Sequence, residues 1–342
     1  MLKILIIQFR QLGDILLTTP VISAIKAAHP DSAIDVVTYP MGNLILTGNG
    51  EIHRHWVAPQ TGLRATVRFV REIRRQHYDA VIDFMGTPRS ALLAFAIKAL
   101  RKITFASKRS RFFTDIVPRG LEPDYIVREK FQLLAPLGIK PQSEHLSLPW
   151  SSSDAKVTEK FLGDHSKVKG SRRRVMLSPT HRRTERKWPK SSWVELARWL
   201  ATEQNAAVIW VWGPGEEAEI DELNHLSGDI GIKTPKASFK ELAALVAATD
   251  LFICNSNGPS HIAVAVNTPS IQLHGTTSAI CWSPMSLRHR GLQGVAIADI
   301  SLEAVKGMIL DMWPMVDDGA GKLRVHGVIT SDREALTVRP DF

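Results

Sequence analysis

Short apolar runs alternate along this chain with segments in which apolar residues recur every three or four positions. The first run, Ile4 to Ile7, gives way at the polar turn 10–14 to a helical pattern that ends at Pro30. Runs of this length are typical of buried strands, and the wider spacing is typical of amphipathic helices. The opening 30 residues therefore predict a strand followed by a helix.

The alternation continues on both sides of a polar segment at 141–172. Before it, strands are expected at 33–39 and 78–86, and helices at 61–76, 90–100 and 128–137. After it, strands are expected at 174–180, 206–212, 229–234, 250–255 and 269–275, and a helix at 238–248. Strands that alternate with helices are typical of a parallel sheet, and so of the α/β class.

Two domains fit this pattern. The polar segment contains "PQSEHLSLPWSSSD" and "KVKGSRRR", a composition that is typical of a domain boundary. We expect one Rossmann-like domain at 1–160, a second at 161–320 and a tail of unknown role at 321–342. Two such domains place the carboxyl ends of both sheets on a central cleft, which suits one ligand per domain.

Composition narrows the class of protein. A length of 342 residues, 44% of them hydrophobic, supplies enough core for two domains of ordinary size. Only Cys254 and Cys281 are present, which predicts no disulfide framework and a reducing compartment. No apolar run is long enough to span a bilayer, and the N-terminus starts with a strand pattern instead of a signal peptide. We therefore expect a cytoplasmic protein.

The net charge of +9 lies almost entirely in the N-terminal half. Residues 1–150 carry 20 Lys/Arg against 12 Asp/Glu, whereas residues 151–342 carry 23 against 22. Four arginines at helical spacing are followed by six more cations: Arg64, Arg68, Arg71 and Arg75, then Lys98, Arg101, Lys102, Lys108, Arg109 and Arg111. Such a stripe is usually a solvated face, but it can also lie on an anionic membrane. Nucleic acid is not expected, because zinc-finger spacing, RNP aromatics and basic heptads are absent.

The polar turn after the first strand places a carboxylate, Asp14, at the start of the helical pattern. Two interpretations are open. Asp is a favourable N-cap, because the helix dipole attracts negative charge there. Alternatively, the first strand-to-helix turn of an open α/β sheet faces the ligand crevice, which would place Asp14 in a site.

The stretch "GPGEE" at 213–217 follows a very apolar strand. Glycine permits a tight turn, and Glu216 and Glu217 fall in the first helical turn. Acidic residues there are ordinary caps, although a glutamate at this place can also accept the two hydroxyls of a ribose. Because the chain has neither a Walker-type lysine motif nor GxGxxG, it does not read as an ordinary ATPase or dehydrogenase.

The stretch "CNSNGPSH" at 254–261 is more specific. Asn257 can cap a helix, Gly258 lets the backbone approach a ligand, and a proline follows where it costs no hydrogen bond. Free N–H groups at such a helix start can bind a phosphate, and His261, one turn in, could donate to the same group. A lone histidine is more often structural, and no second ligand stands at metal spacing, so no metal site is expected.

The stretch "SPTHRRTERKWPKSSW" at 178–193 crowds five basic side chains between a strand and a helix that starts near Pro189: His181, Arg182, Arg183, Arg186 and Lys187. A solvated loop explains one or two of them. Five beside an anion-binding turn suggest a pyrophosphate clamp, in which each charge-assisted hydrogen bond contributes about 1.5–3 kcal/mol. The C-terminal half therefore reads as a binder of nucleoside diphosphates.

These motifs, together with "RQLGDILLTTPVI", "YDAVIDFMGTPRSALL" and "SFKELAALVAATDLFICNSNGPSHIAVAVNTPSIQLHG", resemble the heptosyltransferases of lipopolysaccharide inner-core assembly, glycosyltransferase family nine. The resemblance runs in order from about residue 2 to about residue 312. It implies a GT-B fold, an ADP-heptose donor in the C-terminal domain, a lipid A-linked core acceptor at the N-terminal domain and an inverting transfer.

The resemblance also implies roles for particular residues. Asp14 stands at the family's general base, and an inverting displacement needs one base and no covalent nucleophile. The expected donor residues are Thr180, Arg186, Lys187, Glu216, Glu217, Ser256, Asn257, Gly258 and His261, and the expected acceptor residues are Arg10, Gly13, Arg89 and Arg111. No metal or cofactor is expected. The expected partners are a lipid-linked anionic oligosaccharide and the inner face of the cytoplasmic membrane.

The chain departs from the family pattern at two positions. Ser256 replaces the aspartate of Asn-Asp-Ser-Gly-Pro, and Arg186 replaces a lysine. Two alternatives therefore stay open: a GT-B enzyme, transferase or epimerase, that uses another nucleotide sugar, or a non-catalytic anion-binding relative. The presence of Asp14, Glu216 and Glu217 argues against the non-catalytic relative.

Overall fold

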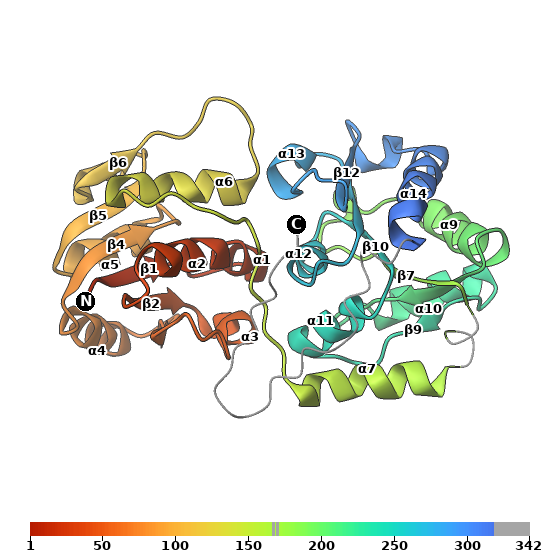
Figure 1. Cartoon of the computed structure of the whole chain (residues 1–342), viewed down its shortest axis with the longest axis horizontal. Helices are drawn as coiled ribbons and strands as arrows, with labels where there is room; N and C mark the ends of the chain where they lie inside the picture. The colour runs from red at the N-terminus through yellow and green to blue at the C-terminus, as the bar shows by residue number, and fades with distance from the viewer. Residues whose placement is uncertain (166–167, 169–170, 318–342) are drawn as a thin grey trace. The chain divides into compact units, whose positions relative to one another are not determined.

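The structure, a computed structural model, describes residues 1–165, 168 and 171–317. The chain divides into two compact units, Met1–Pro149 and the part from Trp150 on. Each unit contains a parallel six-stranded sheet with helices on it (Figure 1). This confirms the predicted α/β class. The predicted tail at 321–342 lies outside the described residues.

In the first unit the strands are β1 (Lys3–Ile7), β2 (Ala33–Thr38), β3 (Arg54–Val57), β4 (Tyr78–Asp83), β5 (Ala99–Phe105) and β6 (Asp115–Val117). Their order in the sheet is β3-β2-β1-β4-β5-β6. The helices are α1 (Leu12–Leu16), α2 (Thr19–Ala28), α3 (Asn43–Leu46), α4 (Leu63–Arg74), α5 (Pro88–Ala96) and α6 (Ile126–Phe131), with short 3₁₀ turns η1 (Pro40–Gly42), η2 (Ser110–Phe112) and η3 (Gln132–Leu137).

In the second unit the strands are β7 (Arg173–Ser178), β8 (Ala206–Trp210), β9 (Ile232–Lys233), β10 (Leu251–Asn255), β11 (Ser270–His274) and β12 (His289–Gln293). The helices are α7 (Ser152–Asp164), α9 (Lys190–Thr202), α10 (Glu217–Ser227), α11 (Phe239–Ala247), α12 (Gly258–Ala265), α13 (Ala279–Trp282) and α14 (Leu302–Asp317), with 3₁₀ turns η4 (Thr184–Arg186) and η5 (Ile297–Asp299). The sheet order is β12-β11-β10-β7-β8-β9.

Both sheets have the same topology, because the second order is the first one read from the other edge. In each unit the order reverses between the first and fourth strands, that is, between β1 and β4 and between β7 and β10. Open α/β sheets bind ligands beyond the carboxyl ends of the strands at such a reversal. Each unit therefore has one topologically favoured position for a ligand.

The central strands are apolar throughout because both faces of the sheet are covered. Leu5 and Ile7 pack with side chains of α4 and α5, while Ile4 and Ile6, on the opposite face, are equally buried. Continuous apolar runs are the expected pattern for such strands. The core of the second unit contains five buried tryptophans, and one of them, Trp188, donates its indole N–H to the Ile300 carbonyl at 2.8 Å.

Three predictions from the sequence are corrected. The helix expected at 90–100 ends at Ala96. Ala99–Phe105 is a strand instead, because it pairs with β4 and β6 and its last three residues are buried. The first helical pattern is divided into α1 and α2 by Thr18. The domain boundary lies after Pro149 and not after residue 160, because α7 packs on α11 of the second unit.

Within the described ranges, no helix combines the length and the apolar composition that crossing a bilayer requires.

The last described helix, α14, is tied to the first strand of its own unit. Asp317 accepts hydrogen bonds from Arg173 Nε at 2.9 Å and Nη2 at 2.6 Å, and from Arg172 Nη2 at 2.7 Å. The Arg173 guanidinium also lies 4.2 Å from the ring of Trp313. These hydrogen bonds from Arg173 lower the pKa of the Asp317 carboxyl below its ordinary value.

We therefore expect Asp317→Asn to destabilise the second unit by about 2 kcal/mol in urea unfolding at neutral pH, because charge-assisted hydrogen bonds are lost. A carboxyl whose pKa is lowered by folding stabilises at higher pH, so the difference from wild type should shrink as the pH falls through and below 3.8. Asp311→Asn is the matched control, since that side chain is 75% exposed and lies 3.9 Å from Arg290. Equal stability of the two variants would contradict this role.

Candidate active site

The turn between β1 and α1 places Asp14 beyond the carboxyl end of the first strand. Asp14 is partly buried, and its Oδ2 accepts the backbone N–H of Gln11 at 3.1 Å. The backbone carbonyl of Asp14 accepts the hydroxyl of Thr18 at 2.8 Å, which fixes the end of the helical turn. The N-cap is Gln11, so Asp14 supports the helix start from its third position instead of capping it directly. Its carboxylate sits at the reversal point of the sheet.

A second carboxyl group, Asp83, ends β4 at the same place. It pairs in register with Ile7 of β1 and is fully buried. Its Oδ1 accepts the N–H groups of Met85 at 2.8 Å and Gly86 at 3.4 Å. Burial raises the pKa of Asp83 to about 6, against the lowering effect of these donors. Arg109 approaches the same turn and donates to the Gly86 carbonyl at 3.1 Å.

A buried lysine from α6 lies behind the Asp14 turn. Lys130 is 5% exposed and donates from Nζ to Gln8 Oε1 and Thr18 Oγ1, each at 3.0 Å. Its ammonium lies 4.5 Å from the ring centroid of Phe84. Burial lowers the pKa of Lys130 to about 8, while the Asp14 charge raises it and that of Arg119 lowers it.

The predicted acceptor residues are spread over the first unit. Gly13 lies within α1 beside the base candidate, and Arg10 is exposed in the turn before it. Arg89 donates to the Gln60 carbonyl at 2.9 Å, and Arg111, on η2, places its guanidinium 5.0 Å from a phenylalanine ring. Arg10 and Gly13 therefore belong to the Asp14 turn, whereas Arg89 and Arg111 are engaged elsewhere in the unit.

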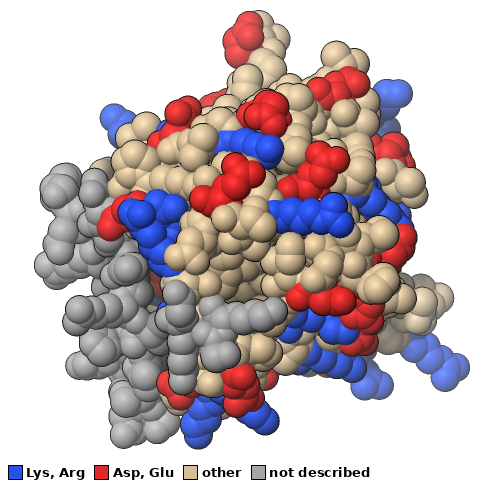
Figure 2. All heavy atoms as spheres, turned by 90° about the vertical axis from the view of Figure 1, so that its right-hand side faces the viewer, with Lys and Arg blue, Asp and Glu red and all other residues tan. Residues whose placement is uncertain are grey.

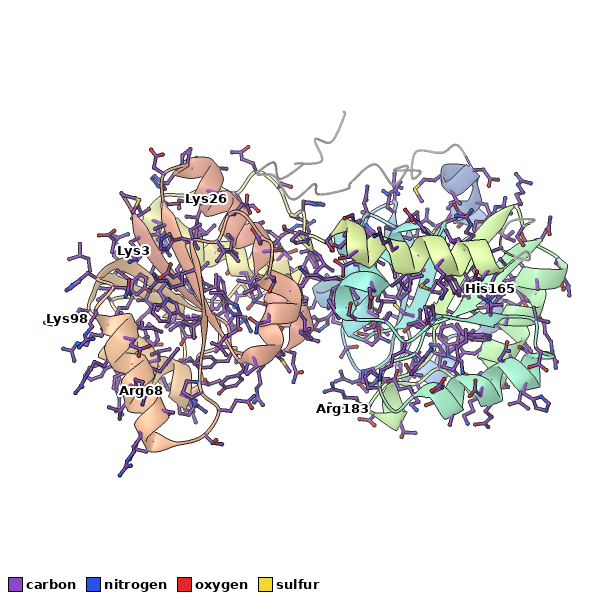
Figure 3. All side chains as sticks on the ribbon, turned by 90° about the horizontal axis from the view of Figure 1, so that it is seen from below. Lys3, Lys26, Arg68, Lys98, His165 and Arg183 are labelled. Carbon is purple, nitrogen blue, oxygen red and sulfur yellow. The ribbon has the colours of Figure 1, made fainter. Side chains whose placement is uncertain are left out.

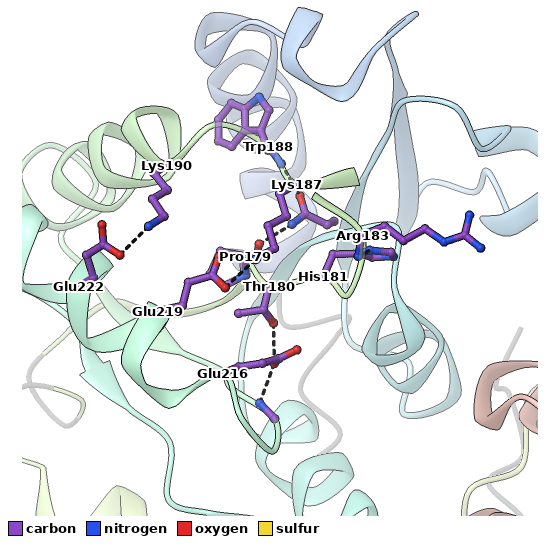
Figure 4. A network of polar contacts seen from close by, with 12 residues as sticks. Pro179, Thr180, His181, Arg183, Lys187, Trp188, Lys190, Glu216, Glu219 and Glu222 are labelled. Carbon is purple, nitrogen blue, oxygen red and sulfur yellow. Dashed lines mark hydrogen bonds and ion pairs between the residues drawn. The ribbon is translucent and has the colours of Figure 1, made fainter. Parts of the chain in front are cut away.

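In the second unit, Glu216 joins two segments that follow neighbouring strands (Figure 4). Its Oε2 accepts the hydroxyl of Thr180 at 2.7 Å and the backbone N–H of Gly213 at 2.8 Å. Glu217 points elsewhere and pairs with Lys233 at 2.9 Å. The structure thus brings the predicted Thr180 and Glu216 together and separates Glu217 from them.

The basic side chains of the loop 181–187 do not all face the same surroundings. Lys187 is ion-paired with Glu219, at 2.8 and 2.6 Å to the two carboxylate oxygens. Arg183 points away from this network (Figure 4). The Nε of Arg186 is buried and has no hydrogen-bond partner among the described residues. Arg186 is therefore the cation of the loop that is best placed to serve a ligand.

The turn after β10 is bonded to the loop after β7, across the reversal point. Asn255 is buried and its Oδ1 accepts the backbone N–H of Trp188 at 3.1 Å. Asn257 donates to Ser178 Oγ at 3.2 Å and to the Thr180 carbonyl at 3.1 Å. These amides hold the start of α12 and the loop after β7 in one arrangement.

The start of α12 is open and lined with unused polar atoms. A Cβ added at Gly258 would meet no heavy atom within 4 Å. His261 is buried with Nδ1 unpartnered among the described residues, and His274 is buried with Nε2 in the same condition. Ser256 accepts the hydroxyl of Thr277 at 3.3 Å, and Thr277 lies 3.4 Å from His274 Nδ1. Buried polar atoms of this kind call for ligand or water partners.

Both of these histidines are neutral near pH 7. Burial lowers the pKa of His261 to about 4, and it lowers that of His274 to about 4 as well, with a further lowering by His261. A neutral imidazole has one N–H donor and one acceptor nitrogen. Within the described ranges, no three His, Cys, Asp or Glu side chains are grouped as a metal site would require.

Sequence reasoning missed four of these residues. Asp83 lies inside the strand predicted at 78–86, where a carboxylate among apolar residues was a usable signal. Lys130, His274 and Thr277 carried none, because their roles come from contacts with residues distant in sequence or from burial.

Comparison with known proteins places the chain in a family. Residues 66–301 match the sequence profile of glycosyltransferase family 9 (heptosyltransferase). Lipopolysaccharide heptosyltransferase 3 of Escherichia coli is 30% identical over 293 residues, which cover 80% of this chain and 84% of that protein. The lipopolysaccharide core heptosyltransferase OpsX of Haemophilus influenzae is 25% identical over 291 residues, which cover 82% of this chain and 80% of the relative.

Solved structures show the same fold. A glycosyl transferase of family 9 from Veillonella parvula superposes with a TM-score of 0.78 at 18% identity, over 92% of this chain and 97% of that one. The ADP-heptose lps heptosyltransferase II of E. coli superposes with a TM-score of 0.74 at 18% identity, over 92% and 99%. Two Rossmann-like units in this arrangement of strands make the GT-B architecture. The chain therefore belongs to glycosyltransferase family 9, the heptosyltransferase family, and is a glycosyltransferase.

Proposed function

We propose that this enzyme transfers a heptose from ADP-heptose to the inner core of a lipopolysaccharide or lipooligosaccharide, with inversion and with Asp14 as the general base. The proposal rests on the residues at the reversal point of each sheet. In the first unit the Asp14 carboxylate follows β1. In the second unit the start of α12, which can bind an anion, follows β10, and Glu216 contacts Thr180 in the loop after β7. The lipopolysaccharide acceptor is supported by the names of relatives at 25–30% identity.

The second unit has the groups that an ADP moiety needs. The start of α12 offers backbone N–H groups and an open approach at Gly258, which suits a diphosphate. Arg186 and His261 supply donors whose hydrogen-bonding capacity is unused by the described residues. Glu216 is held by Thr180, so that its carboxylate has a fixed position from which to accept ribose hydroxyls.

Asp14 suits the role of base better than the neighbouring Asp83. Asp83 is completely buried, and two backbone N–H groups occupy one of its oxygens, so an acceptor hydroxyl cannot reach it without rearrangement. Asp14 is only partly buried. In the proposed reaction, the Asp14 carboxylate takes the acceptor proton while the acceptor oxygen bonds to the anomeric carbon and ADP leaves with the electron pair of the broken bond.

The α12 turn and the cation of Arg186 stabilise the negative charge that develops on the departing diphosphate. Donors fixed before the reaction are effective because they need no reorganisation when charge appears.

The first unit has a surface that suits an anionic bilayer. The arginines Arg64, Arg68 and Arg71 of α4 are exposed, and Arg68 projects outward in Figure 3. Leu63 and Val67 of the same helix are 80% and 53% exposed. Cations beside exposed apolar side chains are typical of helices that lie in a membrane interface. We therefore propose the inner membrane surface, which carries the lipid-linked anionic acceptor, as a partner.

A second part of the same unit has the same character. Phe95 and Leu100 are 59% and 82% exposed on the rim of a hollow of about 650 Å³. The same hollow is lined by Arg74, Lys98 and Lys102, and Lys98 points outward in Figure 3. By contrast, the face of the second unit drawn in Figure 2 mixes acidic and basic side chains. The charge asymmetry seen in the sequence thus coincides with exposed apolar groups in one unit.

A second candidate function is transfer or epimerisation of another nucleotide sugar. Ser256 favours it, because a hydroxyl that accepts from Thr277 stands where the family has a carboxylate, and this removes a negative charge from the donor turn. Product analysis with a panel of ADP-, UDP- and GDP-sugars distinguishes the candidates. Turnover of ADP-heptose with a lipooligosaccharide acceptor supports the first, turnover of another donor alone supports the second, and turnover of none would support a non-catalytic relative.

For the base, we expect Asp14→Asn to lower kcat by about 10²–10⁴-fold, the usual worth of a positioned base. ADP affinity should stay within a few-fold of wild type, because the donor groups belong to the second unit. Single-turnover product formation and calorimetric titration of ADP measure the two quantities. Near-normal turnover by the variant would leave Asp14 as a support of the helix start only.

For the donor clamp, we expect Arg186→Ala to weaken ADP binding by roughly 1–3 kcal/mol, as loss of a charged hydrogen bond does. Lys187→Ala should have a smaller effect, because Glu219 already holds that ammonium. Lys190→Ala is the matched control, since this lysine is paired with Glu222 on the exposed surface. Calorimetric titration with ADP tests the order, and an Arg186→Ala affinity equal to that of the control would rule out the clamp.

For the membrane, co-sedimentation with vesicles containing phosphatidylglycerol should exceed that with neutral vesicles and should decrease with salt, because a shorter Debye length weakens the attraction. The double change Arg68→Glu and Arg71→Glu should reduce binding, at about 1 kcal/mol per charge. Lys156→Glu with Lys160→Glu, on α7 of the second unit, is the control of equal charge change. Equal losses in both pairs, or recovery that ignores lipid charge, would contradict a membrane-binding first unit.

A further inference from the structure

We infer that Lys130 is a positioning residue for the transfer reaction: its buried ammonium braces the turn that carries Asp14 and keeps a positive charge behind the Asp14 carboxylate. The inference rests on the proposed function, because it assigns a purpose to Lys130 only if Asp14 is the base.

The first argument is geometric. Nζ of Lys130 donates at 3.0 Å to Gln8, before the turn, and at 3.0 Å to Thr18, after it. Gln8 in turn donates to the Arg10 carbonyl at 2.7 Å, and Thr18 donates to the Asp14 carbonyl at 2.8 Å. Two chains of hydrogen bonds therefore start at one ammonium group. One ends at the Arg10 carbonyl, before the base candidate, and the other ends at the backbone carbonyl of Asp14 itself.

The second argument concerns cost. Lysine is almost never fully buried unless it is paired, because desolvation of the ammonium is unfavourable. Lys130 is 5% exposed, with the ring of Phe84 against it. An apolar side chain of similar length would fill the same space without that cost. Packing alone therefore does not account for a lysine at this position.

The third argument is electrostatic. The charged groups that act on Lys130 are Asp14, which raises its pKa, and Arg119, which lowers it; burial is the largest influence and brings the value to about 8. Arg119 is itself ion-paired with Glu129. The Lys130 ammonium and the Asp14 carboxylate are thus close enough to interact electrostatically. Near neutral pH Lys130 is mostly charged, and above about pH 8 it loses its proton.

A base must be ionised and correctly aimed before it can accept a proton. Lys130 contributes to the second condition, because its two hydrogen-bond chains hold the turn that aims Asp14. Lys130 acts through other residues and not on the reacting atoms, because its ammonium donates to Gln8 and Thr18.

The test compares Lys130→Met with wild type in the full-length enzyme, using ADP-heptose and a lipooligosaccharide acceptor. We expect kcat to fall by about 10²-fold, the effect of a small misplacement of a reacting group, with KM for the donor unchanged. The alkaline limb of the pH–kcat profile near pH 8 should disappear, since its titrating group is gone.

Two further variants separate the parts of the inference. Thr18→Val breaks one hydrogen-bond chain and leaves the charge, so kcat should fall while the alkaline limb remains. Lys140→Met removes an exposed lysine of the same unit and should change neither kcat nor the profile.

An unchanged kcat in Lys130→Met, or a lower kcat with the alkaline limb still in place, would overturn the inference and leave the proposed function intact. If Lys130→Met does not fold, Thr18→Val decides, because wild-type turnover in that variant would overturn the bracing role. Failure of the proposed function is recognised separately, by normal turnover in Asp14→Asn.

Discussion

At the reversal point of each sheet, two neighbouring strands send their connections to opposite faces, so no main chain fills the space beyond their carboxyl ends. This constraint fixes where the chemistry of the protein can lie. In the first unit it exposes the turn after β1 and the end of β4, where Asp14 and Asp83 stand. In the second unit it exposes the loop after β7 and the start of α12. The rest of each unit serves to keep these edges in place.

Polar side chains that cross between strands do much of this work. Asn255 joins the end of β10 to the backbone at Trp188, and Asn257 joins the next turn to the loop after β7. In the first unit, Lys130 makes comparable contacts from α6. Asn255 and Lys130 are buried and hydrogen-bonded, which is the condition under which a buried polar group rigidifies its surroundings instead of destabilising them. Both reversal points are thus organised before any ligand arrives, which is the arrangement that electrostatic catalysis requires.

Local signals in the sequence were sufficient for the fold class and for much of the candidate site. Buried strands appear in the sequence as apolar runs. A strand followed by Asn, Gly and Pro predicts a helix start from local sequence alone. The strand Ala99–Phe105 was missed because exposed Leu100 and the charges after it disturb its pattern at one end. The ion pair of Lys187 was not predicted, because its partner Glu219 lies on α10 and no local pattern predicts such a contact. Lys130 was missed for the same reason.

The hydrogen bonds from Arg173 to Asp317 have a consequence for the order in which the two units fold during synthesis. All strands and helices of the first unit come from residues before Pro149, so that unit can fold as soon as this stretch has left the ribosome. The first strand of the second unit is β7, whose first residue is held by the last turn of α14, more than 140 positions later. The first strand of this sheet is therefore synthesised early, whereas the carboxylate that binds it is synthesised almost last. During that interval the Arg173 guanidinium lacks the carboxylate that accepts its hydrogen bonds in the folded unit.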